Sequence, residues 1–280
     1  MINGNEKVCV QGITGKYGKF HTKKMIEYGT NIVCGVSKNN KVTNIENIPV
    51  LDNMFEAVKK YKCDTSIVFV PAPYAKSAIF EAIDSGIKKI ITITEHIPIH
   101  DMIEIHKKAK EKNITFVGPN CPGIILPGIS KIGIMPSSAF KPGDIAIISK
   151  SGTLMYEVSN YLSKKSTGIK IAIGLGGDPI IGTSIDEALE FVTHLNPRKI
   201  VIISEIGGND EIIGIEKFLK KGYNANIQVF FAGRTAPKGK RMGHAGAIIE
   251  GYEGSIEYKE NKLNNIGIFV AKYIEELLEG

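Results

Sequence analysis

The sequence predicts an α/β protein made of two domains with parallel sheets. Short runs rich in valine and isoleucine alternate with longer amphipathic stretches along almost all of its 280 residues. Strands separated by helical stretches of this length are typical of βαβ units, in which helices cover a parallel sheet. A segment rich in proline and glycine, residues 119–143, interrupts the alternation once. We therefore predict a domain over residues 1–122, a linker over 123–143 and a second domain over 144–280.

The first domain is predicted to be a doubly wound sheet, because its apolar runs are separated by helical patterns. The predicted strands are Lys7–Gln11, Ile32–Val36, Ser66–Val70, Lys89–Thr94 and Thr115–Val117. The predicted helices are Gly18–Tyr28, Phe55–Tyr61, Ala75–Ser85 and Pro98–Lys112.

The second domain repeats this alternation at the size of a flavodoxin-like doubly wound domain. Its predicted strands are Asp144–Ser149, Lys170–Gly174, Lys199–Glu205, Gln228–Ala232 and Gly267–Val270. Its predicted helices are Thr153–Ser163, Ser184–Leu195, Asn209–Lys221 and Ala271–Leu278.

The composition excludes several classes of protein. Hydrophobic residues make up 43% of the chain and charged residues 23%, which is typical of a globular protein. No apolar run reaches the roughly 18 to 20 residues that span a bilayer, and the lysines behind the net charge of +6 are too scattered for a nucleic-acid surface. We therefore expect neither a membrane nor a nucleic acid as partner. The N-terminus resembles no targeting peptide, which predicts a cytoplasmic protein, or one of the mitochondrial matrix if a transit peptide has been removed.

The four cysteines, Cys9, Cys34, Cys63 and Cys121, lie far apart in the sequence and form no Cys-x-x-Cys pair. This spacing argues against a zinc site or a disulfide framework and is typical of a reducing compartment. We expect no metal ion on this chain.

A glycine-rich loop, Gly12–Gly18, follows the first predicted strand and opens the first predicted helix. Glycines in that position allow a tight turn and bring backbone N–H groups at a helix N-terminus against a phosphate. A plain turn between a strand and a helix is the simpler alternative. The strand before the loop and the helix after it favour a Rossmann-type nucleotide-binding domain.

The second predicted strand indicates which ligand this loop favours. A NAD site needs an acidic residue about 20 residues further on, to accept a hydrogen bond from the ribose 2′-hydroxyl. Here the strand ends beside Lys38, with Lys41 just beyond. A cation in place of the carboxylate favours an adenosine ligand that is phosphorylated on its ribose. Coenzyme A and NADP both fit that description.

Two further loops follow later strands, at the edge where open α/β sheets bind ligands. The first, Val70–Tyr74, includes Pro71 and offers a rigid ledge suited to packing an extended ligand. The second is Ile93-Thr94-Glu95, where a hydroxyl and a carboxylate end a strand. Glu95 could equally cap the helix that follows.

The second domain offers a candidate anion site at its first helix. Ser151 and Gly152 follow its first predicted strand and open that helix. A helix N-terminus with small residues and hydroxyl groups is a ready site for an anion. An ordinary serine N-cap is the alternative.

His244 is the strongest candidate for a nucleophile. It lies in the loop after strand Gln228–Ala232, between Gly243 and Gly246. The same loop carries cations that would stabilise a phosphate, at Lys238, Lys240 and Arg241. A histidine acts as a nucleophile when an acceptor fixes its tautomer through the other ring nitrogen, and Glu205, at the end of another strand, is best placed for that role. An ordinary surface or core histidine is the alternative.

These motifs together resemble the alpha subunits of succinate–CoA ligases (succinyl-CoA synthetases). The run Thr235–Ile249 resembles the phosphohistidine loop of that family almost residue for residue. Other matching segments follow in the same order along the chain: Gly12–Gly18, Val70–Pro73, Ile93–Glu95, Gly118–Gly123, Ser151–Glu157, Gly176–Pro179 and Glu205–Gly208.

The resemblance implies roles for individual residues. Coenzyme A contacts are implied at Thr14, Gly15, Lys16, Tyr17, Ile93, Thr94 and Glu95, with Asn120 and Cys121 near the thiol end. Tyr156 is implied to bind the substrate, and Ser151 and Gly152 to receive His244, the phosphoryl carrier that Glu205 supports.

Three departures from the family pattern stand out. Asn40 replaces a lysine that contacts coenzyme A, so we expect that contact at Lys38 or Lys41. Arg234 replaces a small or apolar residue, and residues 250–255 replace a loop with more glycine and lysine.

The resemblance implies an acid–thiol ligase of the tricarboxylic acid cycle. Such an enzyme interconverts succinyl-CoA, phosphate and a nucleoside diphosphate with succinate, coenzyme A and the triphosphate. The chain has no Gly-x-x-x-x-Gly-Lys-[Ser/Thr] loop, so a beta subunit is expected to carry Mg²⁺ and ADP/ATP or GDP/GTP, in an αβ or α2β2 assembly. The alternatives are a related ligase for malate, acetate or another acid, an NADP-dependent oxidoreductase, and a non-catalytic CoA-binding sensor.

Overall fold

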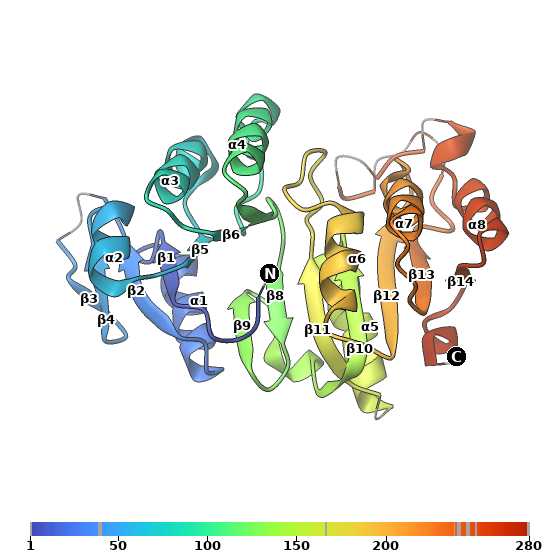
Figure 1. Cartoon of the computed structure of the whole chain (residues 1–280), viewed down its shortest axis with the longest axis horizontal. Coiled ribbons are helices and arrows are strands. Elements are labelled where there is room, and N and C mark those ends of the chain that lie inside the picture. Colours follow the sequence, from blue (N-terminus) through green and yellow to red (C-terminus); the bar gives the residue numbers. More distant parts are fainter. Residues whose placement is uncertain are drawn as a thin grey trace. The chain divides into compact units, whose positions relative to one another are not determined.

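The computed structural model of the chain describes residues 2–38, 41–165, 167–237, 239, 242–244, 247–249 and 251–278. The chain divides into two compact units, of which the first holds Met1–Met135 with Ile180–Gly182 and the second holds Pro136–Pro179 with Thr183–Gly280. Both are α/β (Figure 1). The domain boundaries at residues 122 and 144 stay a prediction.

The first unit contains a mainly parallel sheet. The strands of this unit are β1 (Val8–Gln11), β2 (Ile32–Val36), β3 (Asn44–Ile45), β4 (Ile48–Leu51), β5 (Thr65–Val68), β6 (Lys89–Thr92), β7 (Thr115–Val117), β8 (Gly123–Leu126) and β9 (Ser130–Gly133), of which the first seven form the sheet. Its helices are α1 (Lys16–Glu27), α2 (Met54–Tyr61), α3 (Ala72–Asp84) and α4 (Ile99–Glu111).

The strand order of this sheet is β3-β4-β2-β1-β5-β6-β7, and β8 and β9 pair as an antiparallel hairpin. All neighbours in the sheet run parallel except β3 and β4. Without β3, the parallel strands follow the order 3-2-1-4-5-6, which is that of the Rossmann fold. The predicted Rossmann-type fold is confirmed.

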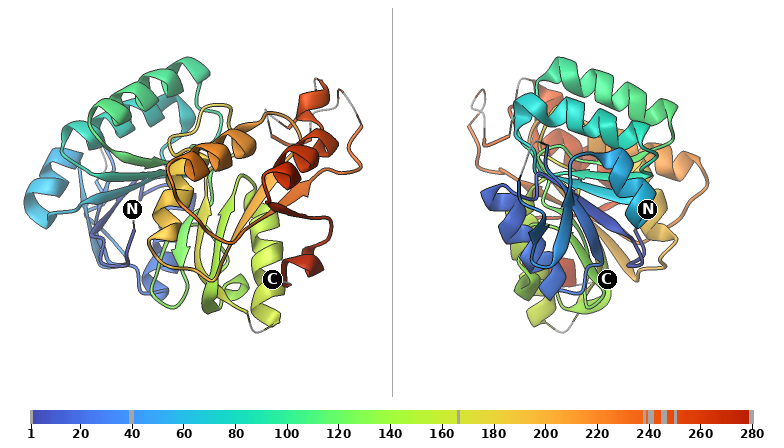
Figure 2. Two further views of the ribbon diagram at one scale, coloured as in Figure 1. Left: turned by 45° about the vertical axis from the view of Figure 1, so that its right-hand side comes forward. Right: turned by 90° about the vertical axis from the view of Figure 1, so that its left-hand side faces the viewer.

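Helices complete the core of the first unit. α2, α3 and α4 pack side by side on one face of the sheet, and Figure 2 shows α3 and α4 as neighbouring helices. α1 lies on the other face, against β9. All four residues of β1 are buried, as expected for a parallel strand with both faces covered.

The second unit contains five parallel strands. They are β10 (Pro142–Ser149), β11 (Ile169–Gly174), β12 (Lys199–Glu205), β13 (Ile227–Ala232) and β14 (Phe269–Ala271). Its α-helices are α5 (Gly152–Lys164), α6 (Ile185–Thr193), α7 (Asp210–Lys220) and α8 (Ile256–Asn265). Short 3-10 helices lie at η1 (Ser137–Ala139), η2 (Tyr252–Gly254) and η3 (Ile274–Leu278).

These five strands lie in the order β14-β13-β12-β10-β11. Read from β11, this is 2-1-3-4-5, the flavodoxin order, so the predicted fold of the second domain is also confirmed. α6, α7 and α8 are neighbours, whereas α5 packs against η1 and η3. In each sheet the direction of winding reverses beside the first strand of the unit's parallel series. The reversal lies between β1 and β5 in the first unit and between β10 and β12 in the second. Ligands of such folds bind beyond the carboxyl ends of the strands at that point.

Some predicted elements were wrong or missing. Part of the predicted linker 123–143 forms the β8–β9 hairpin, and β3 and β4 were not predicted. The predicted helix Ala271–Leu278 is wrong, because Ala271 belongs to β14 and only η3 follows it. α8 was missed. Among the described residues, no helix is both long and apolar enough to cross a membrane.

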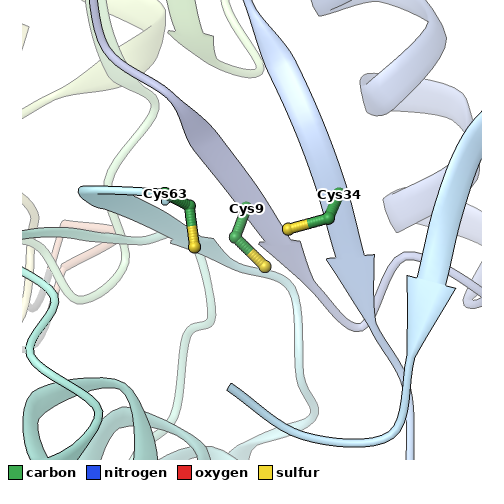
Figure 3. Close-up of side chains that lie close together, drawn as sticks. All are labelled: Cys9, Cys34 and Cys63. Carbon is green, nitrogen blue, oxygen red and sulfur yellow. The ribbon is translucent and has the colours of Figure 1, made fainter. Parts of the chain in front are cut away.

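Three of the cysteines meet in the core, which their spacing in the sequence did not indicate. The sulfur atoms of Cys9, Cys34 and Cys63 lie within 4.8 Å of one another (Figure 3), and the Cys9 thiol lies 3.6 Å from the Met54 thioether. All four cysteines of the chain are free and buried, and buried free cysteines pack as small apolar side chains. The expectation that this chain binds no metal stays a prediction, which elemental analysis of the purified protein would check.

Candidate functional site

A pocket of about 590 Å³ lies at the carboxyl ends of β1, β2 and β5, the switch point of the first sheet. This volume is in the range of small-molecule sites. The lining residues are Gln11, Gly12, Thr14, Gly15, Lys16, Tyr17, Gly18, Val36, Ser37, Lys38, Phe69, Val70, Pro71, Tyr74, Ser77, Ala78 and Glu81. The glycine loop predicted from the sequence therefore forms one wall of a real cavity.

The glycines of this loop are required by its geometry. Gly12 has a φ of +81°, and a Cβ atom at Gly18 would lie 2.1 Å from the Gly12 carbonyl oxygen. α1 starts directly after Gly15, and no side chain caps it. The N–H groups of its first turn therefore remain available to an anionic ligand.

One wall of the pocket pairs a cation with an incompletely bonded carboxylate. Lys38, at the end of β2, forms an ion pair with Glu81 of α3 at 3.5 Å. The Oε2 atom of Glu81 is buried and accepts no hydrogen bond from the residues that the structure describes, and a buried acceptor without a donor is unfavourable. A ligand hydroxyl would satisfy Glu81, and a ligand phosphate would meet the exposed ammonium of Lys38.

Several residues predicted to bind a ligand lie outside the lining of this pocket. Lys41 is exposed and, unlike Lys38, is not part of the lining as far as the structure describes it. The other residues outside the lining gather at the ends of β6 and β7, and they are Ile93, Thr94, Glu95, Asn120 and Cys121.

Hydrogen bonds connect this second group of residues internally and to the pocket. The Asn120 N–H donates to the Thr94 carbonyl at 2.9 Å, and the Cys121 thiol, which is buried, donates to the Thr92 carbonyl at 3.3 Å. The Thr94 hydroxyl donates to the carbonyl of Val70, a lining residue, at 2.7 Å. The group therefore adjoins the pocket without forming its wall.

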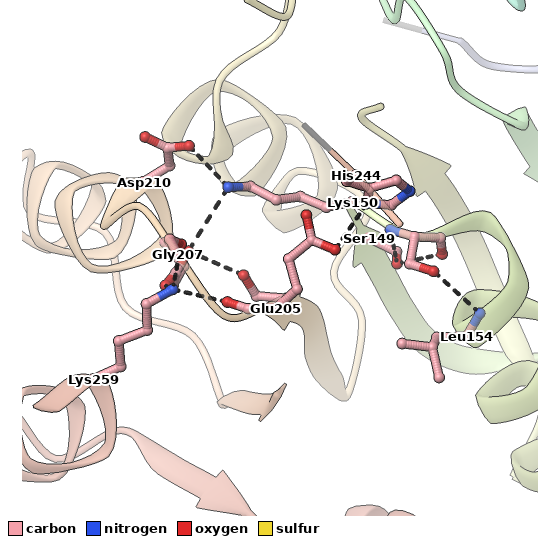
Figure 4. Close-up of polar contacts among 11 residues, drawn as sticks. Ser149, Lys150, Leu154, Glu205, Gly207, Asp210, His244 and Lys259 are labelled. Carbon is pink, nitrogen blue, oxygen red and sulfur yellow. Dashed lines mark hydrogen bonds and ion pairs between the residues drawn. The ribbon is translucent and has the colours of Figure 1, made fainter. Parts of the chain in front are cut away.

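In the second unit, His244 lies at the carboxyl ends of the strands (Figure 4). Its Nδ1 atom is 2.8 Å from Oε2 of Glu205, the last residue of β12. Since an ionised carboxylate only accepts hydrogen bonds, Nδ1 carries the proton in this contact. The lone pair of a neutral His244 ring is then on Nε2, which is the atom free to act as a nucleophile.

Charges around His244 act on the ring from three strands of the sheet. The hydrogen bond to Glu205 raises the pKa of His244, burial opposes that rise, and the charge of Asp178 after β11 adds to it. Lys150 after β10 lowers the pKa of His244. Lys150 itself donates to Asp210 at 2.8 Å. Burial lowers the pKa of Lys150, but the carboxylates of Glu211 and Asp210 outweigh that effect, so the net shift is upward. A permanent cation thus lies near the ring.

Gly177, in the loop after β11, provides the space for the imidazole. A Cβ atom at this position would lie 2.6 Å from the His244 Cδ2 atom and 2.8 Å from Nε2. We expect Gly177→Ala to displace the ring from Glu205 and to lower the pKa of His244 toward its ordinary value of about 6.5. NMR titration of the ring measures this. Gly251→Ala is the control, since a Cβ atom there would meet nothing within 4 Å, and an unchanged titration of Gly177→Ala would contradict the prediction.

The remaining predicted residues of the second unit lie on α5. Ser151 is the N-cap, and its hydroxyl accepts from the Leu154 N–H at 3.4 Å, while Gly152 is the first helical residue. Tyr156 is half-buried, and its ring meets that of Phe140 edge-on at 6.2 Å. The N-terminus of α5 thus directly follows the end of β10 and lies next to His244. Tyr156 lies one turn further along the helix.

Of the departures from the family pattern, Arg234 has contacts that can be described. Arg234 donates to the Ala271 carbonyl at 3.0 Å and pairs with Glu260 at 2.5 Å, so it links the ends of β13 and β14 to α8. The predicted phosphate-binding cations, with Asn40, Gly246 and Glu250, lie outside the described residues; they are Lys238, Lys240 and Arg241.

Sequence reasoning gave no role to Glu81, Lys150, Gly177 or Asp178. Gly177 and Asp178 lie in a segment that matched the family, and their place directly after a strand was the available signal. Glu81 lies within a helix and Lys150 beside an apparent cap, so their roles depend on contacts between distant segments.

Comparisons with known proteins identify related chains. Residues 3–96 match the family model of the CoA binding domain, and residues 148–268 match that of CoA-ligase. The succinate–CoA ligase [ADP-forming] subunit alpha 2 of Archaeoglobus fulgidus is 46% identical over 280 residues, which cover 100% of this chain and 97% of the relative. The succinate–CoA ligase [ADP-forming] subunit alpha of Aquifex aeolicus is 44% identical over 273 residues, covering 96% of this chain and 89% of the relative.

Solved structures share the fold at lower identity. ATP citrate lyase of Methanosaeta concilii matches with a TM-score of 0.87 and 20% identity, over 99% of this chain and 49% of that one. A dinucleotide-forming acetyl-coenzyme A synthetase of Ca. Korarchaeum cryptofilum matches with a TM-score of 0.76 and 19% identity, over 98% and 59%. These two likenesses concern the fold alone, whereas the full-length identity to the curated relatives identifies the family. The chain belongs to the family of succinate–CoA ligase alpha subunits.

Proposed function

We propose that this chain is the alpha subunit of a succinate–CoA ligase and that His244 carries the phosphoryl group. The observation that carries this proposal is the hydrogen bond between His244 Nδ1 and Glu205, which leaves Nε2 as the nucleophile at the carboxyl edge of the sheet. The N-terminus of α5 and the cation of Lys150 adjoin that edge. Both favour the negative charge of a phosphoryl group.

The proposed reaction has three balanced steps. A phosphate oxygen attacks the thioester carbonyl of succinyl-CoA, the C–S bond breaks, and the departing thiolate of coenzyme A takes up a proton. His244 Nε2 then attacks the phosphorus of succinyl phosphate, and the P–O bond breaks to release succinate. A nucleoside diphosphate finally attacks phosphohistidine, and cleavage of the N–P bond gives the triphosphate. The covalent intermediate divides one difficult transfer into easier ones.

Glu205 has a defined part in the second step. Attack by Nε2 while Nδ1 keeps its proton leaves a positive charge on the imidazole ring. The carboxylate at 2.8 Å from Nδ1 stabilises that charge as it forms.

We assign coenzyme A to the pocket of the first unit. The uncapped N-terminus of α1 suits its pyrophosphate, and Lys38 suits its ribose 3′-phosphate. The buried Oε2 atom of Glu81 suits a ribose hydroxyl as donor. NADP shares the phosphorylated adenosine, and the family match of residues 3–96 favours coenzyme A. Titration with coenzyme A and with NADPH separates the two ligands.

The Lys38 assignment predicts a specific loss on removal of its charge. We expect Lys38→Met to weaken the binding of coenzyme A about tenfold, the size of one charge-assisted contact. The binding of dephospho-coenzyme A, which lacks the 3′-phosphate, should change less than about twofold. Calorimetry with both ligands measures this difference. Lys41→Met is the matched control, as that lysine is exposed and outside the pocket, and an equal loss for both ligands would contradict the assignment.

We further propose a beta subunit as the partner, in an αβ or α2β2 assembly, that holds Mg²⁺ and the nucleotide. The alpha chain carries no phosphate-binding loop of the Gly-x-x-x-x-Gly-Lys-[Ser/Thr] type, and the relatives are named as alpha subunits. The alpha chain alone should bind coenzyme A and turn over poorly. Assays of the reconstituted complex with succinate, malate and acetate, and with ADP and GDP, give its acid and nucleotide specificity.

Labelling tests the proposed carrier directly. The alpha chain is incubated with its beta subunit and ATP or GTP labelled on the γ-phosphate. We expect a label on His244 whose bond is labile in acid and stable in base. A labelled serine, or no label in a complex that is proven active, would refute the histidine route.

A further inference from the structure

Lys259 of α8 is fully buried, although its side chain is charged. Its ammonium donates hydrogen bonds to the backbone carbonyls of Glu205 and Gly207, each at 2.8 Å. It also forms an ion pair with Glu211 Oε1 at 2.5 Å. A lysine ammonium has three N–H groups, and three acceptors therefore surround it here, as Figure 4 shows for the two carbonyls.

These contacts join separate elements at the turn that follows β12. Glu211, in the first turn of α7, also accepts from the Ser204 hydroxyl of β12 at 3.0 Å. The Gly207 N–H donates to the Gly254 carbonyl of η2 at 2.9 Å. Hydrogen bonds to two carbonyls and from one N–H therefore hold the turn after Glu205. The partners of these groups, Lys259 and Gly254, both follow the His244 loop in the sequence.

The burial of Lys259 is costly unless it serves a contact. Burial lowers the pKa of Lys259, and the Glu211 carboxylate counteracts that shift only in part. Replacing a buried ion pair by apolar residues is often neutral or stabilising. The buried ammonium forms hydrogen bonds to the two carbonyls that an apolar side chain could not form. These bonds fix the backbone on both sides of Ile206.

We propose that Lys259 is a positioning residue for phosphoryl transfer, which holds the Glu205 backbone so that the Glu205 carboxylate meets His244 Nδ1. The inference rests on the proposed role of His244 as the carrier. The side chain of Glu205 accepts from the ring, and Lys259 bonds to the backbone carbonyl of that same residue, so it fixes the backbone from which the carboxylate extends. Lys259 thus acts through Glu205 and not on the ring itself.

Three variants separate this role from a general structural one. Lys259→Met removes the ammonium and keeps an unbranched apolar stem. Glu211→Gln removes the charge of the ion pair but leaves both bonds from Lys259 to the carbonyls. Lys262→Met, an exposed lysine of the same helix, is the control. Where Lys259→Met unfolds, the double variant Lys259→Met/Glu211→Met replaces it, because it leaves no unpaired buried charge.

The first readout is the NMR titration of His244, which requires no activity. Among the described residues, the charged groups that act on this ring are Glu205 from β12, Asp178 from the loop after β11 and Lys150 from the loop after β10. Loss of the Lys259 contacts should release Glu205 and move the titration midpoint of His244 downward. Glu211→Gln and Lys262→Met should leave the midpoint in place.

The second readout is the rate at which His244 is phosphorylated in the complex with the beta subunit. We expect Lys259→Met to lower it about 10- to 100-fold, the order found when a positioned group shifts by about an ångström, and Glu211→Gln to lower it less than about threefold. Binding of coenzyme A should stay within about twofold. A folded Lys259→Met variant with the wild-type rate and midpoint overturns the inference. If the wild type forms no phosphohistidine, the proposed function fails, and the titration still decides whether Lys259 positions Glu205.

Discussion

Replacing His244 by asparagine is expected to abolish phosphorylation of the alpha chain, while coenzyme A should still bind with unchanged affinity. Asparagine keeps an N–H group that can donate to Glu205, but its side chain has no nucleophilic nitrogen. We expect the rate of phosphoryl transfer to fall at least about a thousandfold, as it does when a nucleophile is removed from other covalent catalysts. The measurement combines labelling of the reconstituted complex with calorimetry of coenzyme A.

The expected split between the two measurements follows because different units form the two sites. The His244 contacts belong to the second unit, and every residue that lines the pocket belongs to the first. His194→Asn is the matched control, because that histidine is exposed at the end of α6. A large loss of coenzyme A affinity in His244→Asn would contradict this division of labour.

Much of the fold could be predicted because parallel strands buried on both faces form unbroken apolar runs. β10, β12 and β13 are of this kind, and their predicted bounds agree with the structure to within about two residues. The elements that were missed have the opposite character. In α8 the buried residues are Ile256, Lys259 and Leu263, so a lysine occupies a core position of the helix. Apolar periodicity cannot detect such a helix.

The β8–β9 hairpin was taken for a linker because of its glycines and prolines. A Cβ atom at Gly123 would lie 2.1 Å from the Ile132 carbonyl oxygen, and one at Gly133 would lie 2.1 Å from the Pro122 carbonyl oxygen. These glycines therefore allow two strands to approach closely. In the predicted helix Ala271–Leu278, pairing of Ala271 with Phe230 of β13 overrides the local pattern. Both errors arise because pairing between distant segments is not visible in local sequence.

The two sites differ in how far the sequence could predict them. Glu205 ends one strand and His244 lies in the loop after another, and strands of one parallel sheet end at the same edge, so their meeting could be predicted from topology. Glu81 and Gly177 act through contacts between elements whose relative orientation the sequence does not give. Ile93–Glu95 adjoin the pocket without lining it, and their contact with a ligand stays a prediction.

Glu205→Gln should slow phosphorylation of His244 about a hundred- to a thousandfold, the usual effect of removing one preorganised electrostatic group. Glutamine can still accept from Nδ1, so the ring keeps its orientation. The positive charge that forms on the ring during attack, however, loses its counter-charge. The rate is measured by rapid-quench labelling of the complex, with Glu216→Gln as the control on α7.

The pH dependence of the same variant gives a second test. Only neutral His244 has a free lone pair on Nε2, so the wild-type rate should rise with pH through the raised pKa of His244. Removal of the Glu205 charge lowers that pKa, and the rise should therefore begin at lower pH in the variant. Lys150, which also lowers the pKa of His244, reinforces this direction, whereas Asp178 opposes it.

Stability should follow the same linkage. The folded pKa of His244 is raised, so its pair with Glu205 contributes stability that is fully present below the unfolded pKa of about 6.5 and is lost as pH rises through the folded pKa. Glu205→Gln should therefore lower the melting temperature most near pH 5 to 6 and least near pH 9. An equal loss at both ends would mean that the charge pair with His244 is not the source of the stability that Glu205 contributes. A pH–rate profile with an unshifted midpoint would show that Glu205 does not control the ionisation of His244, and the carboxylate would then have no part in preparing the nucleophile.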